Sequence, residues 1–121
     1  MSALPIEKDI TIYQGAKWSI NLRLTNSNGT PFDLTGYSAK MQIRHDENSE
    51  VLEELGVGTG ITITPGSGDI KLDLTSTETA ALKFKRAEFD VFIRSGTPGE
   101  DVCLIAGKVL VKKRKTIWNL A

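Results

Sequence analysis

Apolar and polar residues alternate with a period of two along most of the chain. The clearest example lies in residues 17–25, whose apolar positions are Trp18, Ile20, Leu22 and Leu24. A β-strand with one buried face and one wet face has this period, because successive side chains of a strand point to opposite faces. Strands of a doubly covered parallel sheet would be apolar on both faces. The pattern therefore predicts strands that bury one face only.

The same alternation predicts further strands, and short polar segments separate them. The strands are expected over 9–13, 37–44, 61–63, 70–74, 87–93 and 102–111, and the turns over 26–30, 65–68 and 96–101. Asn, Gly and Pro in these turns accept backbone conformations that other residues resist. Residues 51–55 (VLEEL) fit either a short strand or a turn of helix. A glycine-rich stretch, 56–60, follows them as a flexible connection, and Gly107 indicates a bulge in the last strand.

Two segments depart from the alternation. Residues 75–84 (TSTETAALKF) begin with Thr75 and Glu78, the spacing of a capping box, which predicts one short helix near 76–82. Residues 31–36 (PFDLTG) predict a corner, because Pro31 lacks an N–H group and polar side chains at 33 and 35 can bond the nearby backbone. Leu34 is expected to be buried there, at the end of the core.

These elements predict an all-β fold, an antiparallel β-sandwich of seven or eight strands with one short helix. The length of 121 residues suits a single domain over 1–121, with 1–8 and 117–121 as extended termini.

A series of short motifs follows one order along the chain. They are PFDLTG at 31–36, MQIR at 41–44, ITI at 61–63, GDIKLDL at 68–74, TSTETAAL at 75–82, FDV at 89–91 and GKVLV at 107–111. This order resembles the immunoglobulin-like β-sandwich of tailed-bacteriophage tail and baseplate proteins. Over residues 9–116 it is similar to the N-terminal domain of phage baseplate upper proteins.

The resemblance implies a function as well as a fold. It implies a structural protein of a tailed-phage virion, in the tail or baseplate, that acts by protein–protein assembly. The expected partners are other virion proteins and further copies of the chain. The expected location is the virion, after synthesis in the cytoplasm of the host bacterium.

Composition narrows the function further. Lys plus Arg equals Asp plus Glu at 15 each, so no net charge draws the chain to nucleic acid or to an acidic membrane. The single cysteine, Cys103, cannot form an internal disulfide. No apolar run reaches the ~18 residues that span a bilayer. The first residues, MSALPIEKD, lack the features of a signal peptide.

The candidate catalytic residues are few. His45 is the only histidine, and it lies in the polar stretch HDENSE, so we expect an exposed loop residue and neither a triad nor a histidine metal cluster. The acidic run 46–54 lacks the spacing of a calcium loop and fits a solvated face. Cys103 fits a buried structural thiol. We therefore expect no enzyme activity, no catalytic residue, no metal and no cofactor.

The C-terminal end carries the candidate assembly interface. Basic residues are consecutive there, and apolar ones follow; the candidates are Lys112, Lys113, Arg114, Lys115, Ile117, Trp118 and Leu120. The basic residues can dock on an acidic surface, and the acidic run 46–54 of a neighbouring copy is one such surface. A solvated tail is the alternative. Trp118 can pack on its own domain or on a neighbour, and interfaces favour buried aromatic anchors.

Other functions stay open at this point. A carbohydrate- or host-receptor-binding module of the phage adhesion apparatus would need exposed aromatic side chains, and the chain has eight aromatic residues in all, several of them in strands. A cellular adhesion domain would share the fold and differ in context.

Overall fold

The computed structural model describes residues 6–96 and 100–116, and these residues are mostly β-strand. The elements are β1 (Ile6–Glu7), β2 (Ile10–Tyr13), β3 (Trp18–Arg23), β4 (Ser38–Arg44), β5 (Val51–Val57), β6 (Gly60–Thr64), the 3₁₀ turn η1 (Pro65–Ser67), β7 (Asp69–Leu74), α1 (Ser76–Ala80), β8 (Arg86–Arg94) and β9 (Asp101–Lys112). The predicted all-β class with one short α-helix is confirmed. Residues 51–55, which fitted either strand or helix, belong to β5.

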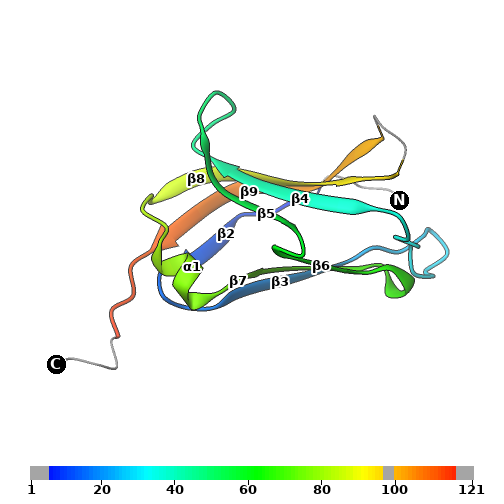
Figure 1. The fold of residues 1–121 in the computed structure, drawn as a ribbon, viewed down its shortest axis with the longest axis horizontal. Helices are drawn as coiled ribbons and strands as arrows, with labels where there is room; N and C mark the ends of the chain where they lie inside the picture. The colour runs from blue at the N-terminus through cyan, green and yellow to red at the C-terminus, as the bar shows by residue number, and fades with distance from the viewer. Residues whose placement is uncertain (1–5, 97–99, 117–121) are drawn as a thin grey trace.

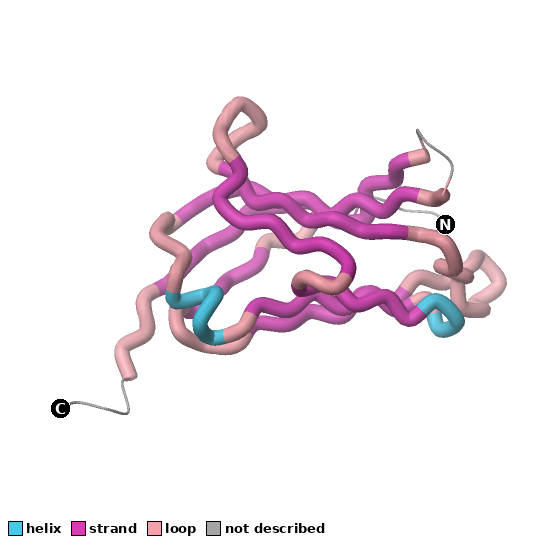
Figure 2. Tube along the Cα trace, in the orientation of Figure 1, coloured by secondary structure: helices cyan, strands magenta, loops and turns pink. Residues whose placement is uncertain are grey.

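The strands form one curled sheet. Its hydrogen-bonded order is β1-β9-β8-β4-β5-β6-β7-β3, and β2 lies beside β1 along the same edge of β9. The sheet curls so that β3 and β7 lie in a layer below β4, β8 and β9 (Figure 1). Figure 2 shows the two layers in magenta, with the loops gathered at their ends. The inner faces of the two layers enclose the core.

The predicted strand count and the predicted wholly antiparallel pairing are wrong. The described residues contain nine strands, because β1 forms inside the expected N-terminal extension and the β5 segment is also a strand. Three pairs are parallel: β1 with β9, β2 with β9, and β5 with β6. The β5–β6 pair involves only residues beside the short connection 58–59, whereas β1 and β2 pair with the last strand of the sequence. The pairing of β2 with β9 therefore joins opposite ends of the chain, which local sequence patterns do not report.

The glycine-rich stretch 56–60, expected to be a flexible connection, forms a hydrogen-bonded corner between the layers. The Gly56 N–H donates to the Thr59 carbonyl at 3.0 Å, and the Thr59 N–H donates back at 2.8 Å. Gly58 and Gly60 have φ values of 84° and 96°, which favour glycine. A Cβ atom on Gly60 would also lie 2.8 Å from Leu55 Cγ. The corner needs glycine for both its turn and its close packing.

The core consists of the side chains that the alternation placed on inner faces. The largest fully buried ones are Ile12, Leu34, Met41, Ile43, Leu55, Ile61, Ile70, Leu72, Leu74, Ile93, Leu104 and Ile105. Trp18, Ile20 and Leu22 are only half-buried and pack against this cluster. These side chains stand on β3, which ends the sheet and has a neighbouring strand, β7, on one side only. Their other side therefore lacks a neighbouring strand to cover it.

Residues 31–36 form the predicted corner. The Phe32 N–H donates to the Leu24 carbonyl at 3.0 Å and the Leu34 N–H to the Pro65 carbonyl at 3.2 Å, which ties the corner to both neighbouring segments. Asp33 Oδ1 accepts from the N–H of Thr35 at 2.9 Å. Leu34 is fully buried, as predicted. It closes one end of the core.

The helix α1 closes the opposite end, and its capping box is confirmed. Thr75 Oγ1 accepts from the Glu78 N–H at 3.1 Å, and Glu78 Oε1 accepts from the Thr75 N–H at 2.9 Å. Thr79 is buried; its hydroxyl accepts from the Gly15 N–H at 3.0 Å and lies 2.9 Å from the Ala16 carbonyl oxygen. The helix therefore fixes the loop between β2 and β3.

The sequence indicated a bulge at Gly107, but the bulge of β9 lies at Leu104. Val91 pairs with Ile105 and Phe92 with Cys103, so Leu104 is the extra residue. Leu104 and Ile105 are consequently both buried in an otherwise alternating strand. Position 107 requires glycine for a different reason. The Lys8 carbonyl packs directly on Gly107, where any side chain would overlap with it.

Replacing Leu34 by alanine is expected to lower the free energy of unfolding by about 2–4 kcal/mol, because the substitution leaves a cavity in the core. Chemical denaturation followed by tryptophan fluorescence measures the change. The control is Val57→Ala at an exposed apolar position of β5, for which a much smaller effect is expected. An unchanged unfolding midpoint in Leu34→Ala would contradict the burial argument.

Replacing Gly107 by alanine is expected to destabilise the fold by about 1–3 kcal/mol, because the added methyl group forces Lys8 away from β9. Its Cβ would lie 2.7 Å from the Lys8 carbonyl carbon. Thermal unfolding measures the loss. Gly66→Ala is the matched control, since a Cβ there meets nothing within 4 Å. Equal melting temperatures for the two variants would refute the close-approach argument.

Candidate assembly surface

The basic residues 112–115 form an exposed segment that leaves the end of β9, and we call it the basic segment. Lys112 is the last residue of β9 and pairs with Tyr13; its carbonyl accepts the Gln14 N–H at 2.9 Å. All four basic residues are exposed. The segment points away from the body of the domain (Figure 1).

The root of the basic segment is anchored. Arg114 Nη1 donates to the Gly15 carbonyl at 3.2 Å, and Arg114 Nε donates to the Thr116 carbonyl at 2.7 Å. The loop that contains Gly15 is the one that Thr79 fixes. The basic segment is therefore presented from a defined position. The other three candidates, Ile117, Trp118 and Leu120, lie outside the described residues, and their role stays a prediction.

The acidic run 46–54 does not form one surface. Asp46 Oδ1 accepts from the Asn48 N–H and from the Ser49 hydroxyl, both at 2.9 Å, which holds the loop between β4 and β5. The hydrogen bond from the Asn48 N–H is the main reason that the pKa of Asp46 lies below its usual value. Glu54 accepts from Gln42 Nε2 at 2.6 Å farther along β5. Within this run, only Asp46 and Glu47 line the groove described next.

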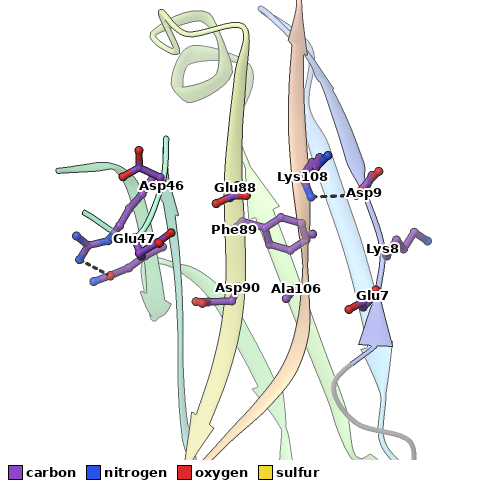
Figure 3. A pocket seen from close by; sticks show the side chains of 13 residues that line it. Glu7, Lys8, Asp9, Asp46, Glu47, Glu88, Phe89, Asp90, Ala106 and Lys108 are labelled. Atoms are coloured by element: carbon purple, nitrogen blue, oxygen red, sulfur yellow. Dashed lines mark hydrogen bonds between the residues drawn. The ribbon is translucent and has the colours of Figure 1, made fainter. Parts of the chain in front are cut away.

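A groove crosses the outer face of the sheet, and we call it the acidic groove. Its floor is formed by β8 and β9, and its walls by the β4–β5 loop and the segment that joins β1 to β2 (Figure 3). Its volume is about 780 Å³. Six carboxylates and three cations line it: Glu7, Asp9, Asp46, Glu47, Glu88, Asp90, Lys8, Arg44 and Lys108. The sequence alone could not show the groove, because these residues come from four separate segments.

Small residues make the floor of the acidic groove low. Ala106 carries only a methyl group there, and the Lys8 carbonyl covers Gly107 beside it. Asp9 Oδ1 accepts from the Lys108 N–H at 3.0 Å and so replaces a backbone acceptor beside them. Burial raises the pKa of Asp90, and the nearby Arg44 opposes that shift. The groove thus offers six carboxylates over a shallow floor, of which Asp90 is half-buried and the other five are exposed.

The two residues considered for catalysis, His45 and Cys103, lie in surroundings that do not activate them. His45 is exposed, and its Nδ1 lies 3.1 Å from the Arg86 carbonyl oxygen. Its ring meets Phe84 edge-on with 6.1 Å between centroids. Cys103 is half-buried, where a buried thiol was expected. Burial, and secondly the charge of Asp90, raise the pKa of its thiol, which disfavours the reactive thiolate.

No group of three or more His, Cys, Asp or Glu side chains among residues 6–96 and 100–116 could hold a metal ion. In the same part of the chain, no helix is long and apolar enough to cross a membrane.

Among the strands that the structure describes, β3 ends the sheet and pairs with β7 on one side only. The Leu24 N–H donates to the Gly68 carbonyl at 2.8 Å, and hydrogen-bonded pairs alternate along antiparallel strands. The backbone groups of Ser19 and Asn21 therefore point away from β7. Arg23 pairs with Asp69 across two contacts of 2.8 and 3.2 Å at the end of this edge. A charged residue on an edge strand discourages uncontrolled pairing.

The fold defines the class of the protein: an immunoglobulin-like all-β domain. No protein-family model matches the sequence. No curated protein matches it either.

The fold of this chain is similar to the folds of several solved structures. The N-terminal domain of phage TP901-1 ORF48 matches with a TM-score of 0.55 and 16% identity, over 88% of this chain and 86% of that one. The extracellular domain of the voltage-gated sodium channel beta4 subunit, described as a parallel homodimer with a role in cell–cell adhesion, matches with a TM-score of 0.50 and 13% identity, over 95% and 98%. At these identities the likeness shows the fold. The resemblance to a phage immunoglobulin-like domain is confirmed.

The ion pair at the β3 edge predicts a pH dependence. Hydrogen bonds from Arg23 and then Ser67 lower the pKa of Asp69 from 3.8 to about 2. A carboxyl group with a depressed folded-state pKa stabilises the fold above its unfolded pKa and loses that contribution as the pH falls through the folded pKa. The advantage of the natural chain over Asp69→Asn should therefore be full above about pH 5 and shrink between about pH 4 and pH 2.

NMR titration of the Asp69 carboxyl carbon measures this pKa directly. In an Arg23→Gln variant the midpoint should move up towards 3.8. A midpoint already near that value in the natural chain would show that the pair does not form in solution.

Proposed function

We propose that this protein is a structural component of a tailed-bacteriophage particle, in its tail or baseplate. It is built as an immunoglobulin-like β-sandwich and acts by binding other particle proteins and further copies of itself. The observation that carries the proposal is the fold likeness to a phage domain over 88% of this chain and 86% of that one. The order of short motifs from residue 31 to residue 111 supports it independently.

The exposed features of the domain suit assembly. The β3 edge offers unpaired backbone groups that a strand of a partner can extend. The acidic groove and the basic segment are oppositely charged surfaces in a chain of zero net charge. Opposite charges across an interface steer encounter and fix its register. The beta4 subunit of similar fold is described as a homodimer, which supports the expectation that the fold can self-associate.

We further propose that the role is not enzymatic. General acid–base or nucleophilic chemistry needs groups positioned for it and activated. The described residues offer His45 beside a backbone carbonyl and Cys103 with a raised pKa. Neither is paired with a second group that would activate it.

The aromatic residues that the structure describes do not favour the carbohydrate- or receptor-binding alternative. A sugar site commonly uses an exposed aromatic ring beside polar side chains. Tyr13 and Phe92 are exposed at 50% and 38%, but they stand on β2 and β8, which are not neighbours in the sheet. Phe32 and Tyr37 pack edge-on against each other, with 5.7 Å between ring centroids.

Particle composition tests the proposal. Phage particles are purified by density gradient from bacteria that carry the gene, and the copy number of this protein is measured by quantitative mass spectrometry. Several copies per particle, together with antibody decoration of the tail in electron micrographs, are expected. An abundant host protein that does not co-sediment is the control.

The proposal is overturned if the protein stays in the soluble fraction while complete particles form. Specific binding of the purified monomer to a glycan array, with no copies in the particle, would favour the receptor-binding alternative.

A further inference from the structure

We propose that the acidic groove receives the basic segment of a second copy of this chain, so that copies associate head to tail. The inference rests on the assembly role proposed above and identifies one partner for it, the chain itself. Its evidence is the shape and charge of two surfaces that lie on different parts of one domain.

Charge complementarity identifies the occupant. The groove carries three more carboxylates than cations, and the basic segment carries four consecutive cations, all exposed. The chain as a whole has zero net charge, so the two excesses of opposite sign belong to these surfaces and not to the chain overall. A positively charged extended peptide is the complement of an open acidic groove, and this chain supplies one.

The geometry of β9 prevents a chain from filling its own groove. Gly107 and Lys108 line the groove, and β9 continues from there to Lys112. At ~3.3 Å per strand residue, Lys112 lies ~13 Å beyond Lys108. Arg114 is then held by the Gly15 carbonyl, on the loop at the far end of β2. The occupant must therefore come from another copy.

The groove suits an extended basic segment. The small side chain of Ala106 keeps its floor shallow, and carboxylates stand on both walls (Figure 3). In an extended segment Lys113 and Lys115 point to the side opposite Arg114. These two lysines can reach the carboxylates while Arg114 keeps its own anchor. Their aliphatic stems can cover apolar atoms of the floor.

Head-to-tail contact has a symmetry consequence. Groove and segment are different surfaces, so each bound copy still offers one free groove and one free segment. Such an interface closes into a ring if the rotation between copies allows it and otherwise continues as a filament.

Two double charge reversals test the inference. The segment variant carries Lys113→Glu and Lys115→Glu, and the groove variant carries Glu47→Lys and Glu88→Lys; all four positions are exposed. Sedimentation velocity of the whole chain is measured at about 0.05 and 0.5 M salt, between which screening rises several-fold. The natural chain should form larger species at low salt that dissociate at high salt. Each variant should associate on the order of 100-fold more weakly, because its reversals remove the net charge of the segment or the excess negative charge of the groove and introduce like-charge contacts.

Mixing the two variants gives the decisive result. The intact segment of the groove variant can enter the intact groove of the segment variant, and the resulting pair has no functional surface left. An equimolar mixture should therefore stop at a one-to-one dimer.

The matched control is Lys71→Glu with Lys83→Glu, which changes net charge as the segment variant does, at exposed positions outside both surfaces. It should assemble like the natural chain. Far-UV circular dichroism and melting temperature check that every variant is folded.

Three outcomes overturn the inference: a natural chain that is monomeric at low salt, variants that assemble normally, or a mixture of variants that forms no dimer. Failure of the proposed function is distinct from these outcomes, because it is read from the particle. If several copies are present in the particle and the charge reversals change nothing, the inference alone fails.

Discussion

Burial of one side-chain face of each strand in a shared core is the constraint on which the rest of the structure depends. No disulfide supports this domain, since its one cysteine is a free, half-buried thiol. The two layers are held by contacts between apolar residues such as Met41, Ile70 and Leu72 and by the backbone corner at 56–60. Everything on the outside, including the acidic groove and the basic segment, takes its position from strands fixed by their inner faces.

The two ends of the core show how local hydrogen bonds support this burial. Leu34 closes one end through a corner tied to Leu24 and Pro65, and α1 closes the other through its buried Thr79. Thr79 also holds the loop that anchors Arg114. One buried hydroxyl therefore links the closing of the core to the direction in which the basic segment leaves it.

The sequence predicted the features that depend on nearby residues. The inner-facing residues of β4 and β8, the capping box of Thr75 and Glu78, and the corner around Leu34 all follow from patterns a few residues long. The parallel pairing of β2 with β9 could not be predicted, because it joins residues about a hundred positions apart. The bulge in β9 could have been predicted, because Leu104 and Ile105 are consecutive apolar residues in an otherwise alternating strand. The acidic groove left none, because four segments build it.

The parallel alignment of β2 and β9 has a mechanical consequence. Residues 10–13 of one strand run beside residues 109–112 of the other, so tension that pulls the two ends of the domain apart acts along the strands and not across them. The hydrogen bonds between β2 and β9 are then all loaded in shear at the same time. They must break together before the domain can extend. Forced unfolding is governed by the height of the unfolding barrier. The domain is thus arranged to carry a pulling force along its length.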